Sequence, residues 1–332
     1  MRSCTSWRSN SNLHGVTGLV KAGSPSLGQD PLDSHIWYYD GTPAAQIFVA
    51  LDYVLPTHAN FSTPDLILAG PNYGLNLGPF FYTLSGTMGA AYAAIQRGIP
   101  AIAYSAAYPT QTSYEWTNTT TAAGLQDPAT IAARLAANLA QGLIDKANGS
   151  RILPLGYGLS VNIPYITSFK DDSCVNPPFI LTRMTGGAVT NKAVYNANTG
   201  LVSTQNTEAD GLNECINGDC GLVGETVVLD SGCFASVSVF TVDYDAPFSG
   251  ERLNVTSPYE LVPSIVQLQN STVLVGGLDA NGTVTGGSGS STSTASAATS
   301  TLSNSATPTN SAAEVRLPLA NFVVLLMISI LM

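Results

Sequence analysis

The sequence predicts an α/β fold built on a parallel sheet, and this prediction depends on two apolar segments with a helix between them. Residues 64–70 form a short apolar run with turn residues at both ends, which is typical of a buried strand. A helix is expected over residues 85–97, and residues 99–104 form a second apolar run. Strand, helix and strand in this order make a βαβ unit, whose two strands run parallel.

Residues favoured at helix ends support both long helices. Gly98 follows the first helix at the position favoured for a left-handed cap. The second helix is expected to begin at Asp127-Pro128, because Asp can cap a helix and Pro suits its first turn. It should run to about Lys146, and Gly149 should close it.

The later part of the folded region predicts further strands. Residues 157–163 again have the pattern of a strand, and from Thr182 onward the sequence is β-rich with turns. We expect this β-rich part to form a hairpin excursion beside the main, mostly parallel sheet.

Composition divides the chain into four segments. The 332 residues are 45% apolar and 10% charged, which suits one α/β domain with a large core plus a tail. Residues 281–313 carry no charge and are mostly small or polar, so a disordered Ser/Thr-rich stalk is expected. The four segments are an atypical N-terminal segment (1–24), a folded domain (25–280), the stalk (281–313) and a hydrophobic C-terminal signal (314–332).

The C-terminal signal predicts an anchor. Residues 317–332 are uncharged but shorter than the roughly 20 residues of a transmembrane helix, and no basic residues follow them. Small residues, a polar spacer and a terminal hydrophobic tail are typical of a glycolipid (GPI) anchor signal, with Asn304 and Asn310 as candidate attachment residues. The alternative is a tail-anchored helix. The predicted location is extracellular, at the plasma membrane or cell wall.

Cysteines and glycosylation sequons also point to an extracellular location. Four of the five cysteines lie between Cys174 and Cys233, consistent with two disulfides in an oxidising compartment. Of the three connectivities we favour Cys215–Cys220 with Cys174–Cys233, and reduced core thiols are the alternative. The sequons begin at Asn60, Asn118, Asn148, Asn254, Asn270 and Asn281.

The charge balance excludes one class of partner. The formal net charge is −10, whereas nucleic-acid binding needs a basic face. Because basic side chains are scarce, a substrate phosphate would have to be neutralised by a metal or by backbone N–H groups.

Residues 68–92 contain the candidate functional residues. Asn72 stands just past the carboxyl end of a buried strand, where open parallel sheets bind ligands. Ser85, Gly86 and Thr87 open the next helix, whose N–H groups and dipole favour an anion. The pattern predicts a phosphate site, and the alternative is a structural turn capped by Ser85.

The same stretch resembles the hallmark of the SurE family, metal-dependent phosphatases that hydrolyse nucleotides or other phosphate monoesters. Its Ser/Ala-Gly-x-Asn-x-Gly-x-Asn-Leu-Gly run appears at residues 69–78, and its Ser-Gly-Thr-x-x-Ala-Ala run at 85–91. Further family segments match residues 41–43, 98–103 and 160–164. The similarity covers about residues 25–170, and the glycosylated, anchored form resembles the fungal branch, often labelled acid phosphatase.

The resemblance implies a three-layer α/β/α, Rossmann-like fold and a divalent metal, Mg²⁺ or Mn²⁺. Asn72 would be a metal ligand, and Asn76, Ser85, Gly86 and Thr87 would bind phosphate. The implied substrate is a nucleotide or another small phosphate ester. Family members often form dimers, so a homodimer stays open.

The sequence departs from the family at the metal site. The family completes that site with an Asp-Asp pair after its first strand and with a loop Ser. This sequence has neither that motif nor a matching Ser. Its only Asp-Asp pair, Asp171-Asp172, follows the core strands and is interpreted as a solvated loop, so the catalytic residues are unassigned. Residues 1–15 lack the apolar region of a signal peptide. Together these departures predict an incomplete gene model or a divergent first exon. The alternative function is a catalytically inactive SurE-fold cell-wall or adhesion protein.

Overall fold

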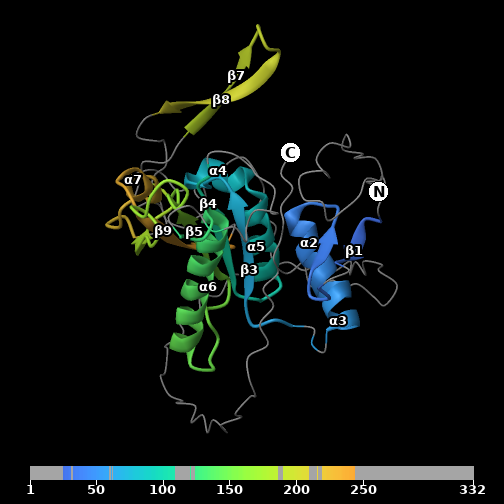
Figure 1. Ribbon diagram of the computed structural model, residues 1–332. Coiled ribbons are helices and arrows are strands. Elements are labelled where there is room, and N and C mark those ends of the chain that lie inside the picture. Colours follow the sequence, from blue (N-terminus) through green and yellow to red (C-terminus); the bar gives the residue numbers. More distant parts are fainter. Residues whose placement is uncertain are drawn as a thin grey trace, which may run out of the picture. The chain divides into compact units, whose positions relative to one another are not determined.

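A five-stranded sheet forms the centre of the protein (Figure 1). The computed structural model describes residues 25–30, 33–59, 61, 63–108, 120, 124–185, 190–208, 215 and 219–243. The predicted N-terminal segment, stalk and C-terminal signal lie outside the described residues. So do the candidate attachment residues Asn304 and Asn310 and all the predicted sequons except Asn148.

The sheet has the order β3-β4-β5-β9-β6. Its strands are β3 (Ile67–Tyr73), β4 (Ala101–Ala106), β5 (Tyr157–Ile163), β6 (Phe179–Thr182) and β9 (Ala235–Thr241). β3, β4 and β5 pair in parallel, β9 pairs antiparallel with β5, and β6 pairs parallel with β9. The predicted α/β class with a mostly parallel sheet is therefore confirmed.

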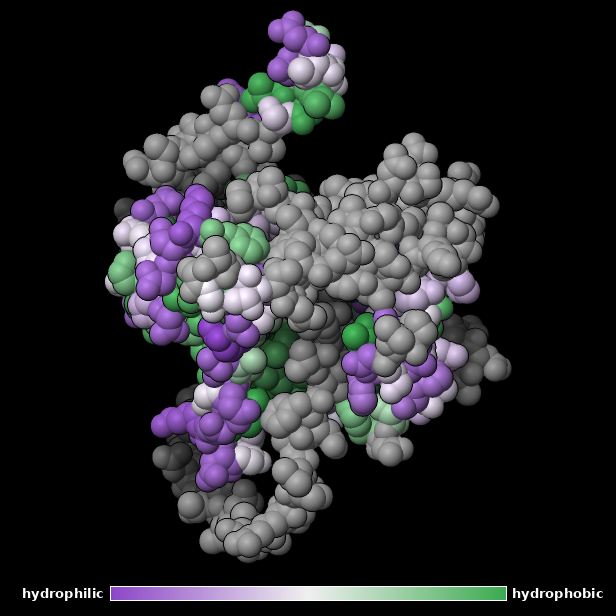
Figure 2. All heavy atoms as spheres, in the orientation of Figure 1, coloured by the Kyte–Doolittle hydropathy of each residue, from purple (hydrophilic) through white to green (hydrophobic). Residues whose placement is uncertain are grey.

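Helices cover both faces of the sheet, and β4 shows why. Every residue of β4 is buried, as expected for a strand covered on both sides. Ala101 and Ala103 belong to one core cluster with helix α5 (Gly86–Gln96). Ile102 and Tyr104 belong to a second cluster with helix α6 (Pro128–Ala147). Because strand side chains alternate between faces, the two helices form separate outer layers, and the outer side of α6 is largely hydrophilic (Figures 1 and 2).

A helix follows the family-like segment at residues 41–43 and packs beside α5. α2 (Pro43–Val49) continues through a π-helical turn, η1 (Ala50–Val54), into α3 (Leu55–His58). The Thr42 hydroxyl caps α2 by accepting a hydrogen bond from the Ala45 N–H (3.3 Å). A short antiparallel pair, β1 (Leu27–Gln29) with β2 (Trp37–Tyr39), precedes it.

The remaining elements confirm the predicted hairpin and add two short helices. β7 (Thr190–Asn196) and β8 (Leu201–Glu208) form a two-stranded antiparallel sheet. α4 (Gly78–Leu84) lies between β3 and α5 in the sequence, and α7 (Glu225–Asp230) precedes β9. Among the described helices, none has both the length and the apolar character needed to cross a membrane.

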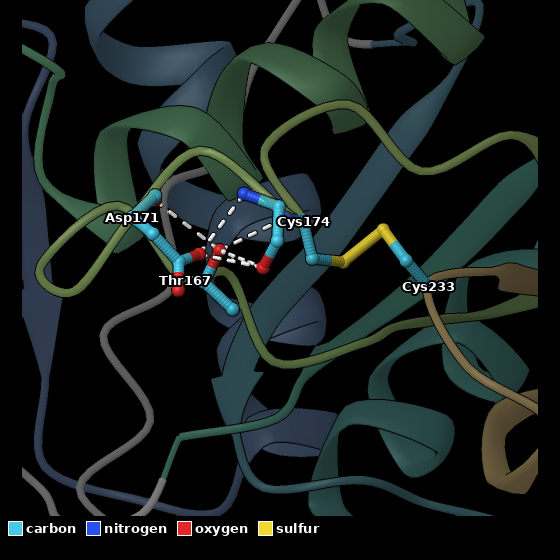
Figure 3. Close-up of a disulfide and its surroundings, with 5 residues drawn as sticks. Thr167, Asp171, Cys174 and Cys233 are labelled. Carbon is cyan, nitrogen blue, oxygen red and sulfur yellow. Dashed lines mark hydrogen bonds between the residues drawn. A yellow bond between two sulfur atoms is a disulfide. The ribbon is translucent and has the colours of Figure 1, made fainter.

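Both favoured disulfides are present, joining Cys174 to Cys233 (Figure 3) and Cys215 to Cys220. Two disulfides indicate an oxidising, secretory or extracellular compartment. The sequon residue Asn148 is exposed at the C-terminal cap of α6, with a left-handed backbone (φ 47°).

Candidate functional site

Five polar side chains meet at the carboxyl ends of the three parallel strands, and we call them the Asn72 cluster. Its members are Asn72, Asn76, Thr87, Ser105 and Asn162. Strand register explains part of the convergence, because Asn72 pairs with Ser105, and Ser105 pairs with Asn162, across β3, β4 and β5. The sequence predicted Asn72 just past the end of the strand, whereas the structure places it inside β3, one residue before its end, at the carboxyl edge of the sheet.

Asn72 is the centre of this cluster. Its Oδ1 accepts hydrogen bonds from Asn76 Nδ2 (2.8 Å), Thr87 Oγ1 (2.9 Å) and Ser105 Oγ (2.8 Å). Asn72 is only 6% exposed, yet polar partners surround its amide group. The bond from Thr87 joins the two hallmark segments, so the glycine-rich loop and the start of α5 lie side by side.

A glycine makes this arrangement possible. The pairing of β3 with β4 shifts register between Ala69 and Asn72, the kind of irregularity that re-aims a side chain. Gly70 lies within the shift at φ +99°, and a Cβ there would lie 2.2 Å from the Tyr104 carbonyl oxygen. A residue with a side chain would clash at this position and disturb the placement of Asn72.

The glycine-rich loop after β3 is bonded to both neighbouring strands. The Gly74 N–H donates to the Ala106 carbonyl (2.8 Å), and the Asn76 N–H donates to Asn162 Oδ1 (2.8 Å). Asn72 Nδ2 also donates to the carbonyls of Tyr73 (2.8 Å) and Gly74 (2.9 Å). These bonds fix the loop above the carboxyl edge of the sheet.

The predicted phosphate-binding residues at the start of α5 all bond or pack within the protein. Ser85 Oγ accepts from the Met88 N–H (3.2 Å) and so caps the helix. Thr87 is 2% exposed and its hydroxyl donates to Asn72. A Cβ on Gly86 would lie 2.7 Å from Pro43 Cγ, so this glycine lets α2 pack closely. A phosphate here would therefore be met chiefly by the backbone and dipole of the helix start.

Glu225, a fully buried carboxyl group close to the loop, was not among the residues predicted from the sequence. Its Oε1 accepts from the Gly78 N–H (2.5 Å), and its Oε2 accepts from Ser238 Oγ (2.9 Å). Burial raises the pKa of this carboxyl to about 7, although both hydrogen bonds oppose the rise. A glutamate in the first turn of a helix is common, so only the tertiary contacts reveal it.

The described residues do not fit a divalent-metal site. They contain no group of three or more His, Cys, Asp or Glu side chains placed to hold an ion. Mg²⁺ prefers several oxygen ligands, whereas Asn72 offers one neutral oxygen that already accepts three hydrogen bonds. The metal role of Asn72 stays a prediction.

The Asp171-Asp172 pair lies in an exposed loop, as interpreted from the sequence. Asp171 Oδ1 accepts from the N–H (2.9 Å) and hydroxyl (2.5 Å) of Ser173, which lowers the pKa of the Asp171 carboxyl. Figure 3 shows Asp171 beside Thr167 and the Cys174–Cys233 disulfide. The pair belongs to a turn that supports the disulfide.

An open cavity of about 440 Å³ lies at the same edge of the sheet. Leu75, Ala107 and Pro164, which follow β3, β4 and β5, line it together with Cys174 and Cys233. Its size and largely apolar lining suit the organic part of a small ligand.

The sequence of the chain is similar to proteins of one family. The family model described as "Survival protein SurE" matches residues 5–190. An acid phosphatase of Yarrowia lipolytica is 44% identical over 234 residues, covering 69% of this chain and 64% of that protein. A 5'-nucleotidase SurE of Sorangium cellulosum is 37% identical over 190 residues, covering 55% of this chain and 56% of that protein. The chain thus spans less than two thirds of the length of either relative.

A solved structure, the crystal structure of the SurE protein from Aquifex aeolicus, is also similar. It is 22% identical in sequence, covers 73% of this chain and 79% of its own, and has a TM-score of 0.43.

Proposed function

Because the chain belongs to the SurE family, we propose that it is a phosphatase acting on small phosphate monoesters, nucleoside monophosphates included. The observation that carries this proposal is the 2.9 Å hydrogen bond from Thr87 to Asn72. It holds the glycine-rich loop against the start of an eleven-residue helix, at the carboxyl edge of parallel strands. Such an edge is the usual ligand site of open α/β sheets, and a helix start favours a phosphate.

Each part of the site would have a separate task in this reaction. The start of α5 would bind the phosphoryl oxygens, which suits a chain of net charge −10 with few basic side chains. The Asn72 cluster would hold the loop rigid, and the adjacent cavity would receive the organic part of the ester. Binding and orientation are therefore the functions that we assign to the described residues.

SurE-family proteins typically depend on a divalent metal, and Mg²⁺ or Mn²⁺ would polarise the phosphoryl group and offset its charge. The described residues contribute only the neutral amide oxygen of Asn72 toward such an ion. We therefore assign no step of the reaction to a metal held by these residues.

Phosphate release from a nucleoside monophosphate and from an aryl phosphate tests the proposal, with Mn²⁺ added or with a chelator. We expect release, and we expect Asn76→Ala to lower kcat/KM about 10-fold or more by loosening the loop. Asn138→Ala is the matched control, because Asn138 is exposed on α6, outside the site. A folded chain that releases no phosphate from either ester with Mn²⁺ would contradict the proposal.

A second candidate, an inactive SurE-fold wall or adhesion protein, is favoured by one observation. All three donors around Asn72 Oδ1 are satisfied within the protein, and no carboxylate cluster is present among the described residues. Under this alternative, wild type and Asn76→Ala release equally little phosphate. Under the phosphatase proposal they differ.

We also propose that the protein is held at the cell surface by the predicted glycolipid anchor. The two disulfides support a secretory route, and the composition of residues 281–332 supports the anchor. Phosphatidylinositol-specific phospholipase C should release the protein from intact cells. Retention on lipase-treated membranes would favour the tail-anchored alternative.

A further inference from the structure

We propose that Glu225 is a positioning residue for the candidate phosphate site, fastening the far end of the glycine-rich loop from inside the protein. The inference rests on the proposed function, but Glu225 lies outside both hallmark segments and 147 residues from the loop it contacts. Three elements meet at its carboxyl group: α7, which it begins, the start of α4, and β9 through Ser238.

The start of α4 explains why the loop needs this contact. The first N–H groups of a helix have no partner within the helix and are usually capped by the residue before it. That residue is Leu77, which has no side-chain acceptor, and Pro79 carries no N–H. The Gly78 N–H, the first of these groups, donates to Glu225 Oε1. Glu225 thus supplies from a distance an acceptor at a helix start where Leu77 offers none.

The same contact completes the support of the loop. At its first end the loop is fixed by Asn72 and, through the Asn76 N–H, by Asn162. At its second end the loop enters α4 at Gly78, where Glu225 holds it. Without Glu225 the loop would stay tied to β3 and β5 but could move at Gly78. Because the loop lies against the start of α5, such motion would disturb the surface that meets a phosphate.

The backbone around Glu225 keeps its side chain in place. The Glu225 N–H donates to the Arg183 carbonyl (3.0 Å), and the Arg183 N–H donates to the Val223 carbonyl (3.0 Å). Ser238 in turn shares a 2.8 Å hydrogen bond with Thr182 on β6. The carboxyl group is 0% exposed, so neither oxygen can exchange its partner for water.

Among the described residues, no charged side chain forms an ion pair with Glu225. The Arg183 guanidinium is bonded to the Leu222 carbonyl (2.6 Å) and to Thr185 Oγ1 (3.2 Å). The other titratable groups on the elements packed around it are Asp230 on α7, Tyr157 on β5 and Tyr82 on α4. Within the described part of the chain, burial raises the pKa of Glu225 and the two hydrogen bonds partly offset that rise.

A neutral carboxyl group can keep both contacts. Its carbonyl oxygen still accepts from the Gly78 N–H, and its O–H can donate to Ser238 Oγ, which can donate to Thr182. Ionisation strengthens the two hydrogen bonds but, among the described residues, leaves a buried charge without a cation, and this desolvation cost outweighs the gain, as the raised pKa of the group indicates. We therefore expect the loop to be held best at acidic pH and less well as pH rises through about 7.

Two substitutions separate positioning from simple packing. Glu225→Gln imitates the neutral acid, since its amide can accept from Gly78 and donate to Ser238, but it does not titrate. Glu225→Leu keeps the volume and removes both hydrogen bonds. Asp145→Asn is the control, because Asp145 is exposed on α6.

The first readout is kinetic, with an aryl phosphate as substrate from pH 4 to 8. Glu225→Leu should lose about 10-fold or more in kcat/KM, whereas Glu225→Gln should stay within about 3-fold of wild type. In wild type kcat/KM should fall as pH rises through about 7, and Glu225→Gln should lack that fall. A Gln variant as impaired as the Leu variant, or one with an unchanged pH profile, would overturn the proposal.

The second readout does not depend on activity. Amide hydrogen exchange of a peptide spanning residues 74–84 should speed up about 10-fold in Glu225→Leu and stay unchanged in Glu225→Gln and Asp145→Asn. Unchanged exchange in a folded Leu variant would also refute the role of Glu225. If wild type releases no phosphate but the exchange result holds, the proposed function fails while the positioning of the loop stands.

Discussion

At the scale of single residues, Asn72 uses its amide group fully. The oxygen accepts three hydrogen bonds, and the nitrogen donates two, to the Tyr73 and Gly74 carbonyls. Flipping this amide is unfavourable, because it would place the amide oxygen against the carbonyl oxygens of Tyr73 and Gly74. The side chains of the cluster are therefore already oriented before a ligand binds. Such preorganisation keeps the free-energy cost of ordering them on binding small.

Substitutions in the Asn72 cluster should lower the free energy of unfolding by different amounts. Asn72→Ala removes an acceptor shared by three donors, of which Asn76 Nδ2 keeps its bond to Ser105 Oγ (2.6 Å), so we expect the free energy of unfolding to fall by about 3 kcal/mol. Thr87→Val removes one hydroxyl of similar shape, and Asn72 keeps two donors, so the loss should be about 1 kcal/mol. Urea unfolding of both variants checks this. Equal losses would mean that the three hydrogen bonds do not share one acceptor in solution.

Glu225 predicts how stability depends on pH. The pKa of its carboxyl is raised from 4.5 to about 7 in the folded chain, so the folded state holds the proton more tightly than the unfolded state. Its contribution is complete below about pH 4.5 and is lost as pH rises to about 7, by about 3 kcal/mol in all. Urea midpoints measured across this window should fall more steeply in wild type than in Glu225→Gln. Parallel curves would contradict the raised pKa.

At the scale of elements, the sequence predicted whether a segment is a helix or a strand better than it predicted the residues at which the element begins and ends. β5 was predicted with its observed bounds, because an exposed Tyr157 is followed by an uninterrupted buried run over residues 158–163. The first predicted strand stopped at residue 70, whereas β3 continues to Tyr73. Gly70 and Pro71 resemble a turn in sequence, but the register shift carries the strand through them. The shift depends on how β4 lies alongside, which a local pattern does not contain.

The same limit explains which site residues were missed. Asn72 and Thr87 were found because they belong to motifs contiguous in sequence. Ser105 and Asn162 join the site through strand register, and Glu225 joins it through packing. β9 was likewise expected only as part of a β-rich remainder from Thr182 onward, and β6 (Phe179–Thr182) was not predicted. The places of both strands in the sheet are fixed by partners far away in the chain.

Two glycines on regular elements should respond in opposite ways to substitution by alanine. Gly142 lies exposed within α6, and a Cβ there would meet nothing within 4 Å. Gly142→Ala should therefore raise the free energy of unfolding by about 1 kcal/mol. Gly70→Ala should lower it, because its Cβ would lie 2.2 Å from the Tyr104 carbonyl oxygen. Thermal unfolding compares both variants with wild type. A neutral Gly70→Ala would show that β3 and β4 are not held as closely as described.

At the scale of the whole described domain, one hydrogen bond and one disulfide join distant parts of the chain near α7. Glu225 ties the start of α7 to the glycine-rich loop, and Cys233 ties the segment after α7 to Cys174. β6, β7, β8 and α7 all lie in the chain between the two cysteines, and β9 follows. The disulfide therefore joins the two ends of the segment 174–233, close to the carboxyl edge of the sheet where the candidate site lies.

The two disulfides should contribute unequally, because they close loops of very different length. Cys174–Cys233 has a sequence separation of 59 and Cys215–Cys220 one of 5. Loop-closure entropy predicts losses of about 4 kcal/mol for the Cys174→Ala/Cys233→Ala pair and about 2 kcal/mol for the Cys215→Ala/Cys220→Ala pair. In the long disulfide, Cys174 also belongs to a hydrogen-bonded turn, in which the Thr167 N–H donates to the Cys174 carbonyl (3.0 Å). Urea unfolding of both double variants measures the difference. If the short-loop pair cost as much as the long-loop pair, closure of the excursion would not be what stabilises this side of the domain.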